Sequence, residues 1–468
     1  MTAGVNGDVS FWYGDLGGLP GFRAALEGDV QCDVAIVGAG YTGLWTAYYL
    51  MKSDPTLRIV IVEREFAGFG ASGRNGGWLS GEMGWSREQY AAKTGRQSVI
   101  DLQSAMWATV DEVIDVCARE GIDADIIKGG SLQVATTASQ AVRVREYVQS
   151  EARWGVSGSD LVFLDAADTR ARIDVADARC SSFTPHAARI QPAKLVQGLA
   201  RVVESMGVRI CERTTVTNIT PHRAVTDRGV VSADYVIRAT EGFTAGIKGY
   251  RREWLPMNSA MIATEPLSDE QWAQIGWNGY ETLGDAAHGY MYAQRTREGR
   301  IAIGGRGLPY RFGSAADING RTQERTVEML EEILVRMFPV LSGARIDHAW
   351  CGVLGVPRDW CATVGLDHTT GIGWAGGYVG MGVATANLSA RTLRGLILAQ
   401  NGSQQEFSET SLPWVNRRVR KWEPEPLRWL GVHGLYTMFR SADRSERRRG
   451  TEKTSRSAQL ASRIAGRD

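Results

Sequence analysis

Residues 32–50 read CDVAIVGAGYTGLWTAYYL, and this stretch decides the fold. Its β-branched start predicts a short strand over Val34–Val37, and the apolar spacing that follows predicts an amphipathic helix from about Tyr41 to Lys52. Between the two lie the glycines of a GxGxxG motif, Gly38, Gly40 and Gly43. The first permits a tight turn, the second lets a pyrophosphate approach the backbone, and the third lets helix and strand pack closely. The stretch therefore predicts a dinucleotide site of the Rossmann type.

The next strand supports this prediction. LRIVIVERE (57–65) predicts a buried strand that ends at Glu63, twenty residues beyond Gly43. A carboxylate at this place is typical of residues that bind a ribose 2′-hydroxyl, and it disfavours a 2′-phosphate. NADP is therefore not expected, while NAD and FAD both remain open.

The following segment, GFGASGRNGGWLSG (68–81), favours FAD. Such a run makes a poor helix or strand, because each glycine loses more chain entropy on folding than any other residue. In an NAD dehydrogenase, nothing requires so long a glycine-rich run after the second strand. In a flavoprotein, the chain here passes along the ribityl group and the isoalloxazine ring, where bulky side chains would collide with the cofactor.

Composition narrows the possible functions. A chain of 468 residues predicts two or three domains, and a formal net charge of +1 gives no overall attraction to nucleic acid, so no nucleic-acid partner is expected. Its six cysteines form no CxxC and no zinc-ligand spacing, so no metal is expected. There is no signal-peptide pattern and no long apolar run. We expect a cytoplasmic protein with reduced thiols.

Seven segments carry a resemblance to the flavin-dependent D-amino acid oxidase superfamily, in particular to its glycine/sarcosine oxidase branch and its gamma-glutamylputrescine oxidoreductase-like group. Together they cover most of residues 32–398. They are VGAGYTGLWTAYYL (37–50), GFGASGRNGGW (68–78), ARIQPAKLVQGLARVVESMGVRICERTTVTNI (188–219), YVIRATEGFT (235–244), GRIAIGGRG (299–307), WCGVLGVPRDWCATVG (350–365) and GWAGGYVGMGVATANLSARTL (373–393).

The resemblance implies an α/β fold in which a Rossmann-type FAD-binding domain is interleaved with a mixed-sheet α+β substrate domain, followed by a C-terminal helical extension. The expected FAD-binding segments are 30–95, 185–250 and 345–400. The expected substrate-domain segments are 96–184 and 251–344, and the basic extension is 401–468.

The resemblance also implies which residues bind FAD. Residues 68–77 are expected to wrap the flavin, with Ser72 near the diphosphate or ribityl group and Arg74 near the ring. Arg74 would there favour the anionic reduced flavin, or alternatively fix the loop through a salt bridge. The expected cofactor set is Gly38, Gly40, Gly43, Glu63, Arg64, Ser72, Arg74, Asn75, Gly76, Val216, Ala239, Thr240, Gly352, Gly377, Gly380, Met381, Gly382 and Val383.

Two positions bear on how the cofactor is held and reoxidised. Some relatives attach FAD covalently through a cysteine, but counting back from Asp359 places that position on Gly352 and not on Cys351, so we expect noncovalent FAD. Sarcosine-type oxidases carry a lysine over the flavin, and Ala302 stands at the corresponding place. Without this cation, superoxide formation is less assisted. A dehydrogenase using another electron acceptor is therefore as open as an oxidase using O2.

The expected reaction is oxidation of the C–N bond of a primary or secondary amine to an imine, which is hydrolysed to an aldehyde or ketone. Positioning provides most of the catalysis. Amino acid oxidases of the superfamily bind the substrate carboxylate with an arginine, which the stretch IDHAWCG (346–352) lacks. An N-substituted or D-amino acid oxidase remains the alternative. Expected catalytic residues are Arg74 and Trp350, and expected substrate residues are Trp78, Trp85, Tyr290, Tyr292 and Arg306, whose aromatic members could hold an ammonium group.

The C-terminal extension is rich in arginine. Its segment EPEPLRWLGVHGLYTMFR (423–440) predicts a short amphipathic helix after a proline-rich joint. We expect this helix to pack across the chain's own body, in preference to contact with an anionic membrane, a partner or a second subunit of a homodimer. The run from Ser441 has few apolar residues and is expected to be mobile. An alternative function of another class is a flavin-bound interaction protein that acts through this basic tail.

Overall fold

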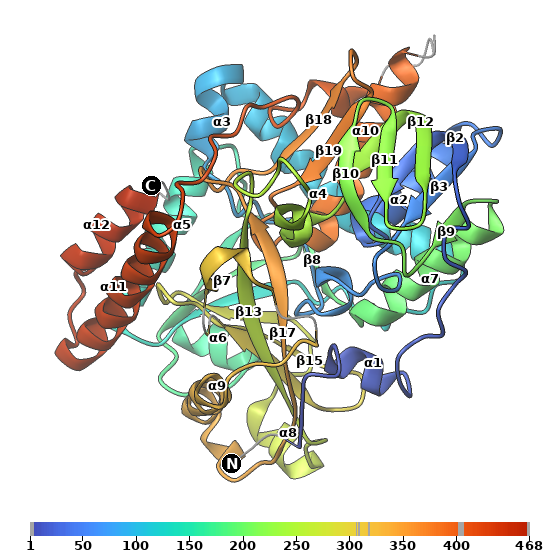
Figure 1. Cartoon of the computed structure of the whole chain (residues 1–468). Coiled ribbons are helices and arrows are strands. Elements are labelled where there is room, and N and C mark those ends of the chain that lie inside the picture. The colour runs from blue at the N-terminus through green and yellow to red at the C-terminus, as the bar shows by residue number, and fades with distance from the viewer. Residues whose placement is uncertain (1–3, 306, 308, 317–318, 401–406, 466–468) are drawn as a thin grey trace.

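Two large β-sheets organise the chain in the computed structural model, which describes residues 4–305, 307, 309–316, 319–400 and 407–465. Figure 1 shows one sheet towards the upper right and the other below it, with the C-terminal helices at the opposite side of the molecule. Among the described helices, none has both the length and the apolar character to cross a membrane. The expected α/β architecture with a helical C-terminal extension is confirmed.

The eight-stranded sheet contains the predicted dinucleotide-binding unit. Strand β2 (Val30–Val37) pairs in parallel with β3 (Ile59–Val62) on one side and with β12 (Val230–Arg238) on the other. β2 and β3 are almost continuously apolar because they are covered on both faces, as in other parallel sheets. The remaining strands are β9 (Arg209–Cys211), β10 (Val216–Thr220), β11 (Arg223–Thr226), β18 (Thr363–Asp367) and β19 (Ile372–Gly376).

The nine-stranded sheet is mixed, as expected for the substrate side. Its longest pairing is antiparallel, between β13 (Leu255–Thr264) and β17 (Ile346–Val356), while β14 (Thr282–Asp285) pairs in parallel with β5 (Ser131–Ala135). A separate two-stranded sheet joins β4 (Trp78–Ser80) to β8 (Ala187–Arg189). The other strands of the large sheet are β1 (Val5–Asn6), β6 (Val162–Leu164), β7 (Cys180–Thr184), β15 (Tyr292–Arg295) and β16 (Ile301–Gly305).

Strand pairing differs from the expected segment boundaries at one point. β17 belongs to the nine-stranded sheet, so the eight-stranded sheet resumes at β18 and not at residue 345. The sequence pattern could not show which of the two sheets β17 joins, because a flavin-site motif follows β17 on the same stretch of chain.

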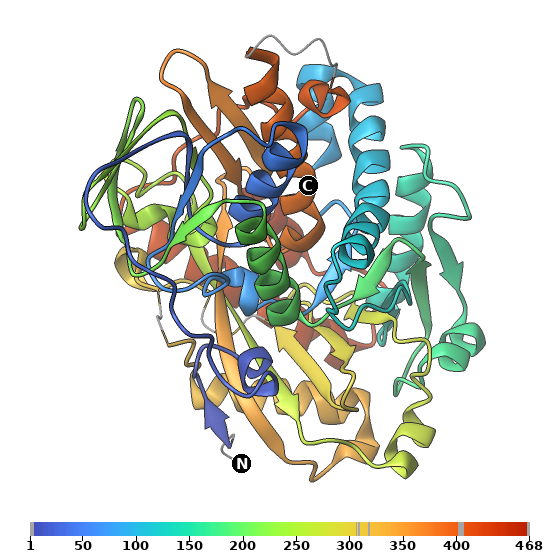
Figure 2. The ribbon, with the colours of Figure 1, turned by 90° about the vertical axis from the view of Figure 1, so that its right-hand side faces the viewer.

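Helices cover the sheets and bury their apolar faces. Figure 2 shows α2 in blue, α7 in green and α10 in orange next to one another beside the eight-stranded sheet, with α4 in light blue at their flank. The helices are α1 (Phe11–Asp15), α2 (Tyr41–Ser53), α3 (Arg87–Thr94), α4 (Arg96–Arg119), α5 (Ala138–Ala152), α6 (Ala166–Arg172), α7 (Pro192–Ser205), α8 (Asp269–Ile275), α9 (Glu324–Met337), α10 (Gly382–Gln400), α11 (Leu427–Arg449) and α12 (Arg456–Ala465).

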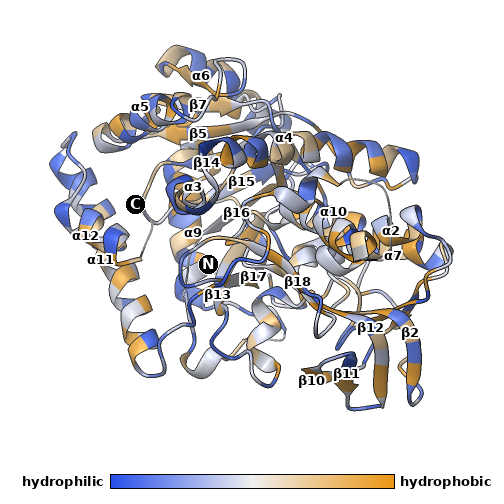
Figure 3. Cartoon of the chain, turned by 90° about the horizontal axis from the view of Figure 1, so that it is seen from above, coloured by the Kyte–Doolittle hydropathy of each residue, from blue (hydrophilic) through white to orange (hydrophobic). Residues whose placement is uncertain are grey.

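The C-terminal extension is more regular than the sequence suggested. α11 does not end near Ser441 but continues to Arg449, and α12 folds back against it, so the expectation of a mobile run is wrong. The few apolar residues suffice because they lie on one face: Phe439 and Ala442 of α11 pack on Ala458 and Ala461 of α12. Figure 3 shows the resulting mixture of hydrophobic and hydrophilic residues along both helices. We call α11 and α12 the C-terminal hairpin.

Replacing Gly43 by alanine tests the close packing of α2 on β2. A Cβ at this position would lie 2.0 Å from the carbonyl oxygen of Gly38 and 3.1 Å from Cγ2 of Ile36. We expect Gly43→Ala to lower stability by about 1–3 kcal/mol through overpacking, measured by thermal unfolding of the purified protein. The matched control is Gly431→Ala in α11, where a Cβ would have no neighbour within 4 Å. This variant should gain up to about 1 kcal/mol from helix propensity. Equal effects of the two substitutions would contradict the packing explanation.

Candidate functional site

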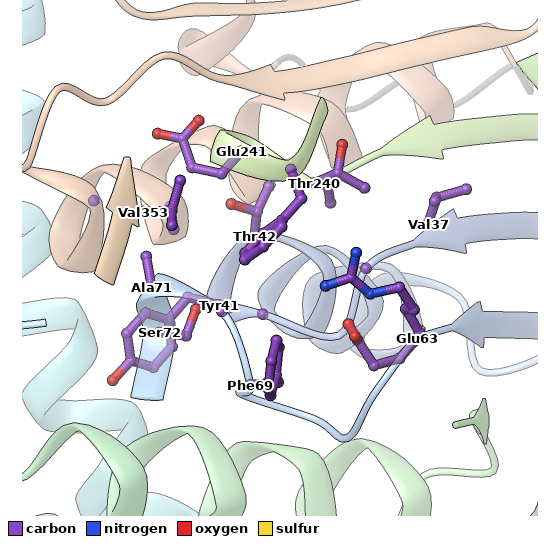
Figure 4. A pocket seen from close by; sticks show the side chains of 18 of the residues that line it. Val37, Tyr41, Thr42, Glu63, Phe69, Ala71, Ser72, Thr240, Glu241 and Val353 are labelled. Carbon is purple, nitrogen blue, oxygen red and sulfur yellow. Dashed lines mark hydrogen bonds between the residues drawn. The ribbon is translucent and has the colours of Figure 1, made fainter. Parts of the chain in front are cut away.

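A long cleft opens at the ends of β2 and β3 and runs towards the start of α10. Figure 4 shows Val37 and Glu63 at one end of this cofactor cleft and Ala71, Ser72 and Val353 towards the other. The predicted residues that line it are Gly38, Gly40, Glu63, Arg64, Ser72, Asn75, Val216, Ala239, Thr240, Gly380, Gly382 and Val383. Five segments distant in the sequence therefore meet in one cleft.

The glycine turn after β2 has the conformation that the motif requires. Gly38 has φ +106°, and a Cβ on it would lie 2.6 Å from the carbonyl oxygen of Ala239. Gly40 caps α2 without a side chain, which leaves the helix N-terminus open to the cleft. The Ser72 hydroxyl accepts a hydrogen bond from the Tyr41 amide at 2.8 Å and so ties the glycine-rich run to this helix. Such an open helix start suits a phosphate group.

Glu63 lies at the end of β3, where the sequence placed it. Its carboxylate accepts hydrogen bonds from the amides of Ala39 (2.9 Å) and Glu65 (3.0 Å). Burial raises the pKa of this carboxyl above its ordinary value. The acid is thus held by main-chain amides at the cleft wall, where it can accept a further hydrogen bond from a hydroxyl group.

Most glycines of the run 68–77 are required by the protein itself. A Cβ at Gly68 would lie 2.4 Å from Val196, and one at Gly73 would lie 2.4 Å from the Tyr13 hydroxyl. At Gly76 it would meet the Tyr292 ring at 2.8 Å, and at Gly77 the Gln294 amide at 1.8 Å. The run is therefore compressed between the N-terminal segment, α7 and β15. Its members that line the two cavities are Phe69, Gly70, Ala71, Ser72, Arg74, Asn75 and Gly76.

The N-terminal segment supports the glycine-rich run 68–77 through hydrogen bonds. Ser10 donates a hydrogen bond to the carbonyl oxygen of Gly73 (2.7 Å), and the Trp12 indole donates one to that of Asn75 (2.8 Å). β1 in turn pairs with β17 at His348. No recognisable motif occurs in the first fifteen residues, so this role could not be predicted from the sequence.

Arg74 has its guanidinium group fixed within the protein. The side chain is 2% exposed, its Nε donates to the Phe69 carbonyl oxygen at 2.7 Å, and its guanidinium carbon lies 4.3 Å from the centre of the Phe69 ring. Its Nη1 lies 3.5 Å from the Cys351 carbonyl oxygen. These contacts fit the loop-fixing alternative, with main-chain carbonyl groups among the partners of the guanidinium.

Glu241 is a site residue that the sequence analysis missed. It follows Thr240 in the cleft wall, and its carboxylate accepts hydrogen bonds from the amides of Gly377 (3.0 Å) and Tyr378 (3.1 Å). Burial raises its pKa to about 7. Glu241 thereby holds the glycine loop before α10. Gly377 does not line either cavity; a Cβ there would lie 2.4 Å from Pro357.

A second cavity of about 340 Å³ adjoins the cofactor cleft. The two share Ala71, Asn75, Leu354, Gly380 and Val383, so the cofactor cleft opens directly into it. We call it the substrate cavity, because its volume lies in the range of small-molecule sites. The predicted residues that line it are Arg74, Asn75, Gly76, Trp78, Tyr290, Tyr292, Gly352, Gly380, Met381 and Val383.

Aromatic rings form one wall of the substrate cavity. Trp78 and Tyr292 meet edge to face with ring centres 6.2 Å apart. The Trp78 indole donates to the Ala293 carbonyl oxygen at 3.1 Å, and the Tyr292 hydroxyl lies 2.8 Å from that of Ser259. The rings are therefore held in place by the nine-stranded sheet.

Two carboxyl groups that the sequence analysis missed also line this cavity, Glu82 and Asp285. Burial raises the pKa of Glu82 to about 7 and that of Asp285 to about 6. Asp285 accepts a hydrogen bond from the Met291 amide at 3.0 Å. No Lys, Arg or His within the described part of the chain forms an ion pair with either. The cavity therefore offers negative charge to a ligand.

Several predicted residues lie elsewhere. Trp350 is fully buried behind the glycine-rich run, where its indole donates to the Arg74 carbonyl oxygen at 2.9 Å, and it does not line the substrate cavity. Trp85 packs on Trp414 and Tyr90 in the core and does not line the substrate cavity. Gly43 packs inside α2. Arg306 lies outside the described residues.

The six cysteines and Ala302 bear on how the cofactor is held and reoxidised. None of the six cysteines lines the cofactor cleft or the substrate cavity. Cys351 directs its thiol to the Arg321 carbonyl oxygen at 3.2 Å, away from Gly352, which does line the substrate cavity. Ala302, at the position of the family lysine, is buried in β16.

The cleft fits FAD. It has an acid where a ribose binds and an open helix start where a diphosphate binds. Gly380 lies at the far end of the cleft and has no side chain there. A Cβ on Gly380 would meet no protein atom nearer than 4.0 Å and would enter the cleft. Glycine is needed there because φ is +107° and because the space belongs to a ligand.

Comparison with known proteins identifies relatives along most of the chain. The family described as DAO, FAD dependent oxidoreductase, matches residues 33–396. Gamma-glutamylputrescine oxidoreductase of Escherichia coli K12 is 29% identical over 380 residues, covering 80% of this chain and 85% of that protein. Sarcosine oxidase subunit beta of an Arthrobacter species is 21% identical over 399 residues, covering 82% and 90%. Glycine oxidase of Bacillus cereus shares the fold with a TM-score of 0.65 at 19% identity, covering 83% and 99%.

Glu241→Gln provides a test of the buried acid at the cleft. In the folded protein the pKa of this carboxyl is about 7, against an ordinary 4.5, so the folded state binds the proton more tightly. Its contribution to stability is therefore full at low pH and is lost as pH rises through this interval. We expect the wild type to lose on the order of 3 kcal/mol relative to Glu241→Gln across this range, since one pKa unit is about 1.4 kcal/mol. Melting curves at several pH values measure the difference. Parallel pH dependence in the two proteins would exclude a raised pKa at Glu241.

Proposed function

The chain belongs to the DAO family of FAD dependent oxidoreductases, and from this premise we propose that it oxidises the C–N bond of a primary or secondary amine to an imine, which water then hydrolyses to an aldehyde or ketone. One observation carries the proposal. The cofactor cleft opens, at Ala71, Asn75 and Gly380, into a cavity with aromatic and acidic walls. A small cationic ligand there would lie directly beside the cofactor.

When bound, FAD supplies the acceptor for the two electrons that leave the substrate. The expected cofactor set stays a proposal, with Glu63 at the ribose, Gly38 and Gly40 at the diphosphate, and Gly380 near the ring. The protein's part in the reaction is to hold and orient the substrate. Trp78 and Tyr292 present their rings to an amine, and the fixed positions of these rings restrict its orientation.

Charge in the substrate cavity favours an amine over an amino acid. An amino acid oxidase needs a cation for the substrate carboxylate, usually an arginine. Arg74 is the one cationic side chain in the described lining of the substrate cavity, and its guanidinium is bound by main-chain carbonyl groups. Glu82 and Asp285 would repel a carboxylate. The name of one relative, gamma-glutamylputrescine oxidoreductase, refers to an amine derivative, whereas sarcosine, named in another, is an N-methyl amino acid and fits the alternative.

Other observations bear on the cellular compartment of the protein and on the alternative function as an interaction protein. All six cysteines are free, which suits a reducing compartment such as the cytoplasm. The C-terminal hairpin packs on the catalytic body through Glu446 and His433, so the chain is better described as an enzyme with a docked extension than as a scaffold acting through a loose tail.

If FAD is bound noncovalently, precipitating the protein with acid should release the yellow flavin into the supernatant. We expect all flavin in the supernatant, both for the wild type and for Cys351→Ser, because the Cys351 thiol faces away from the substrate cavity. Absorbance of the supernatant and the pellet measures this. Colour in the wild-type pellet that disappears with Cys351→Ser would establish a covalent link.

Anaerobic mixing with candidate substrates tests the reaction itself. We expect alkylamines or polyamines to bleach the flavin absorbance at about 450 nm, and glycine, sarcosine and D-alanine to bleach it far less, because the cavity walls are acidic. Admission of air then distinguishes an oxidase, whose colour returns, from a dehydrogenase, whose colour does not. Faster bleaching by the amino acids would establish the alternative, an N-substituted or D-amino acid oxidase.

A further inference from the structure

The substrate cavity continues outward into a more open space, which we call the vestibule. Glu82, Asp285 and Tyr290 line both spaces and so form the neck between them. The vestibule is lined further out by Tyr147 of α5 and by Phe439 and Ser462 of the C-terminal hairpin. The hairpin is therefore part of the route to the active site.

This wall lies outside the part of the chain that the family match covers. The family match ends at residue 396, whereas α11 begins at Leu427. Figures 1 and 3 both show the hairpin beside α5, at the side of the molecule away from β2 and β12. Relatives that lack such a hairpin would leave this side of the neck open.

Two acids of α11 attach the hairpin to the loop between β14 and β15. Asp443 accepts hydrogen bonds from the amides of His288 and Gly289, both at 2.9 Å. Glu446, 3% exposed, accepts from the His288 ring at 3.0 Å and from Arg143 of α5 at 2.9 Å. The same loop continues into Tyr290, Met291 and Tyr292, which line the substrate cavity. The hairpin thus fixes the loop that carries the aromatic wall.

The vestibule and its neck carry an excess of negatively charged side chains. Arg143 is neutralised by Glu446, with which it forms an ion pair at 2.9 Å. His288 bonds to the same carboxylate. Glu82 and Asp285 in the neck have no ion-pair partner within the described residues, and nearby carboxylates raise the pKa of both further. Asp285 is buried, with Arg336 as a nearby cation that lowers its pKa, and Glu82 is half-buried. A bound cation would stabilise the charged form of both acids.

We propose that the neck and vestibule form a second subsite, which binds the distal, positively charged end of an elongated amine substrate, and that the C-terminal hairpin builds its outer wall. This inference rests on the proposed function. One amino group would lie beside the cofactor, while a second one would lie between Glu82 and Asp285. Tyr147, Tyr290 and Phe439 supply rings that attract an ammonium group.

Three series of substrates with equal chain length test the charge preference. They are 1-aminoalkanes, α,ω-diamines and ω-amino acids, which place a methyl, an ammonium or a carboxylate at the distal end. We expect kcat/KM for flavin reduction to rank ammonium above methyl above carboxylate, with at least about tenfold between the first and the last, equivalent to about 1.4 kcal/mol. The reverse ranking would overturn the subsite while leaving amine oxidation intact. No bleaching by any series would overturn the proposed function and the subsite with it.

Substitution of Glu82, one of the two acids of the neck, tests where the preference for a distal ammonium group arises. We expect Glu82→Gln to raise KM for the diamines about tenfold more than it raises KM for the 1-aminoalkanes, because only the diamines carry a distal ammonium group that loses its counter-charge. The matched control is Glu88→Gln on α3, an exposed acid outside both spaces, which should change neither. Equal effects of Glu82→Gln on diamines and 1-aminoalkanes would overturn the assignment.

Substitution in the hairpin tests the outer wall. We expect Phe439→Ala to raise KM for long diamines severalfold, with kcat for short 1-aminoalkanes unchanged. Leu430→Ala, on the exposed side of the same helix, should have no effect. Flavin content and melting temperature show whether Phe439→Ala folds, and Phe439→Leu replaces it if it does not. A loss of kcat shared by all substrates would reduce the hairpin to a purely structural role and overturn its place in the subsite.

Discussion

Both cavities depend on one constraint, which is that main-chain segments lie in direct contact at several glycines. Gly43 lies against the carbonyl group of Gly38, and Gly38 against that of Ala239, so β2, α2 and β12 approach one another without intervening side chains. The same principle applies at Gly73, Gly76 and Gly77, where the glycine-rich run is pressed onto the N-terminal segment and β15. The cofactor cleft is the space that remains between these contacts, and Gly38, Gly40 and Gly70 contribute to its walls.

Buried acids form the second theme of the site. Glu63 and Glu241 are satisfied by main-chain amides, and each therefore fixes a loop of the cofactor cleft. Glu82 and Asp285 face the substrate cavity without a cation, so their negative charge is available to a ligand. A raised pKa does not distinguish the carboxylates that fix loops of the cofactor cleft from those that face the substrate cavity, so only their positions do.

The sequence predicted the features that depend on local order along the chain. β2, the glycine turn, α2 and Glu63 follow one another between Val30 and Glu63, and their roles could be assigned from spacing. Trp350 and Trp85 could not be placed from the sequence because an aromatic residue packs equally well in a core and in a cavity, and only the tertiary contacts decide. Glu241, Glu82 and Asp285 were missed because no motif surrounds them. α11 extends further than predicted because α12 supplies its apolar partner.

The position of the N-terminal segment bears on how the chain is made. Residues 10–12 support the glycine-rich run, yet their own anchor, β1, pairs with β17 about 340 residues later and His348 bonds to the Gly7 carbonyl group. During synthesis these first residues leave the ribosome long before their partner exists. The cofactor cleft can therefore be completed only after most of the protein has emerged, and contacts of such long sequence separation form slowly. Flavin incorporation should accordingly be a late event, close to chain release, and extensions fused to the N-terminus would interfere with it more than extensions fused to exposed loops.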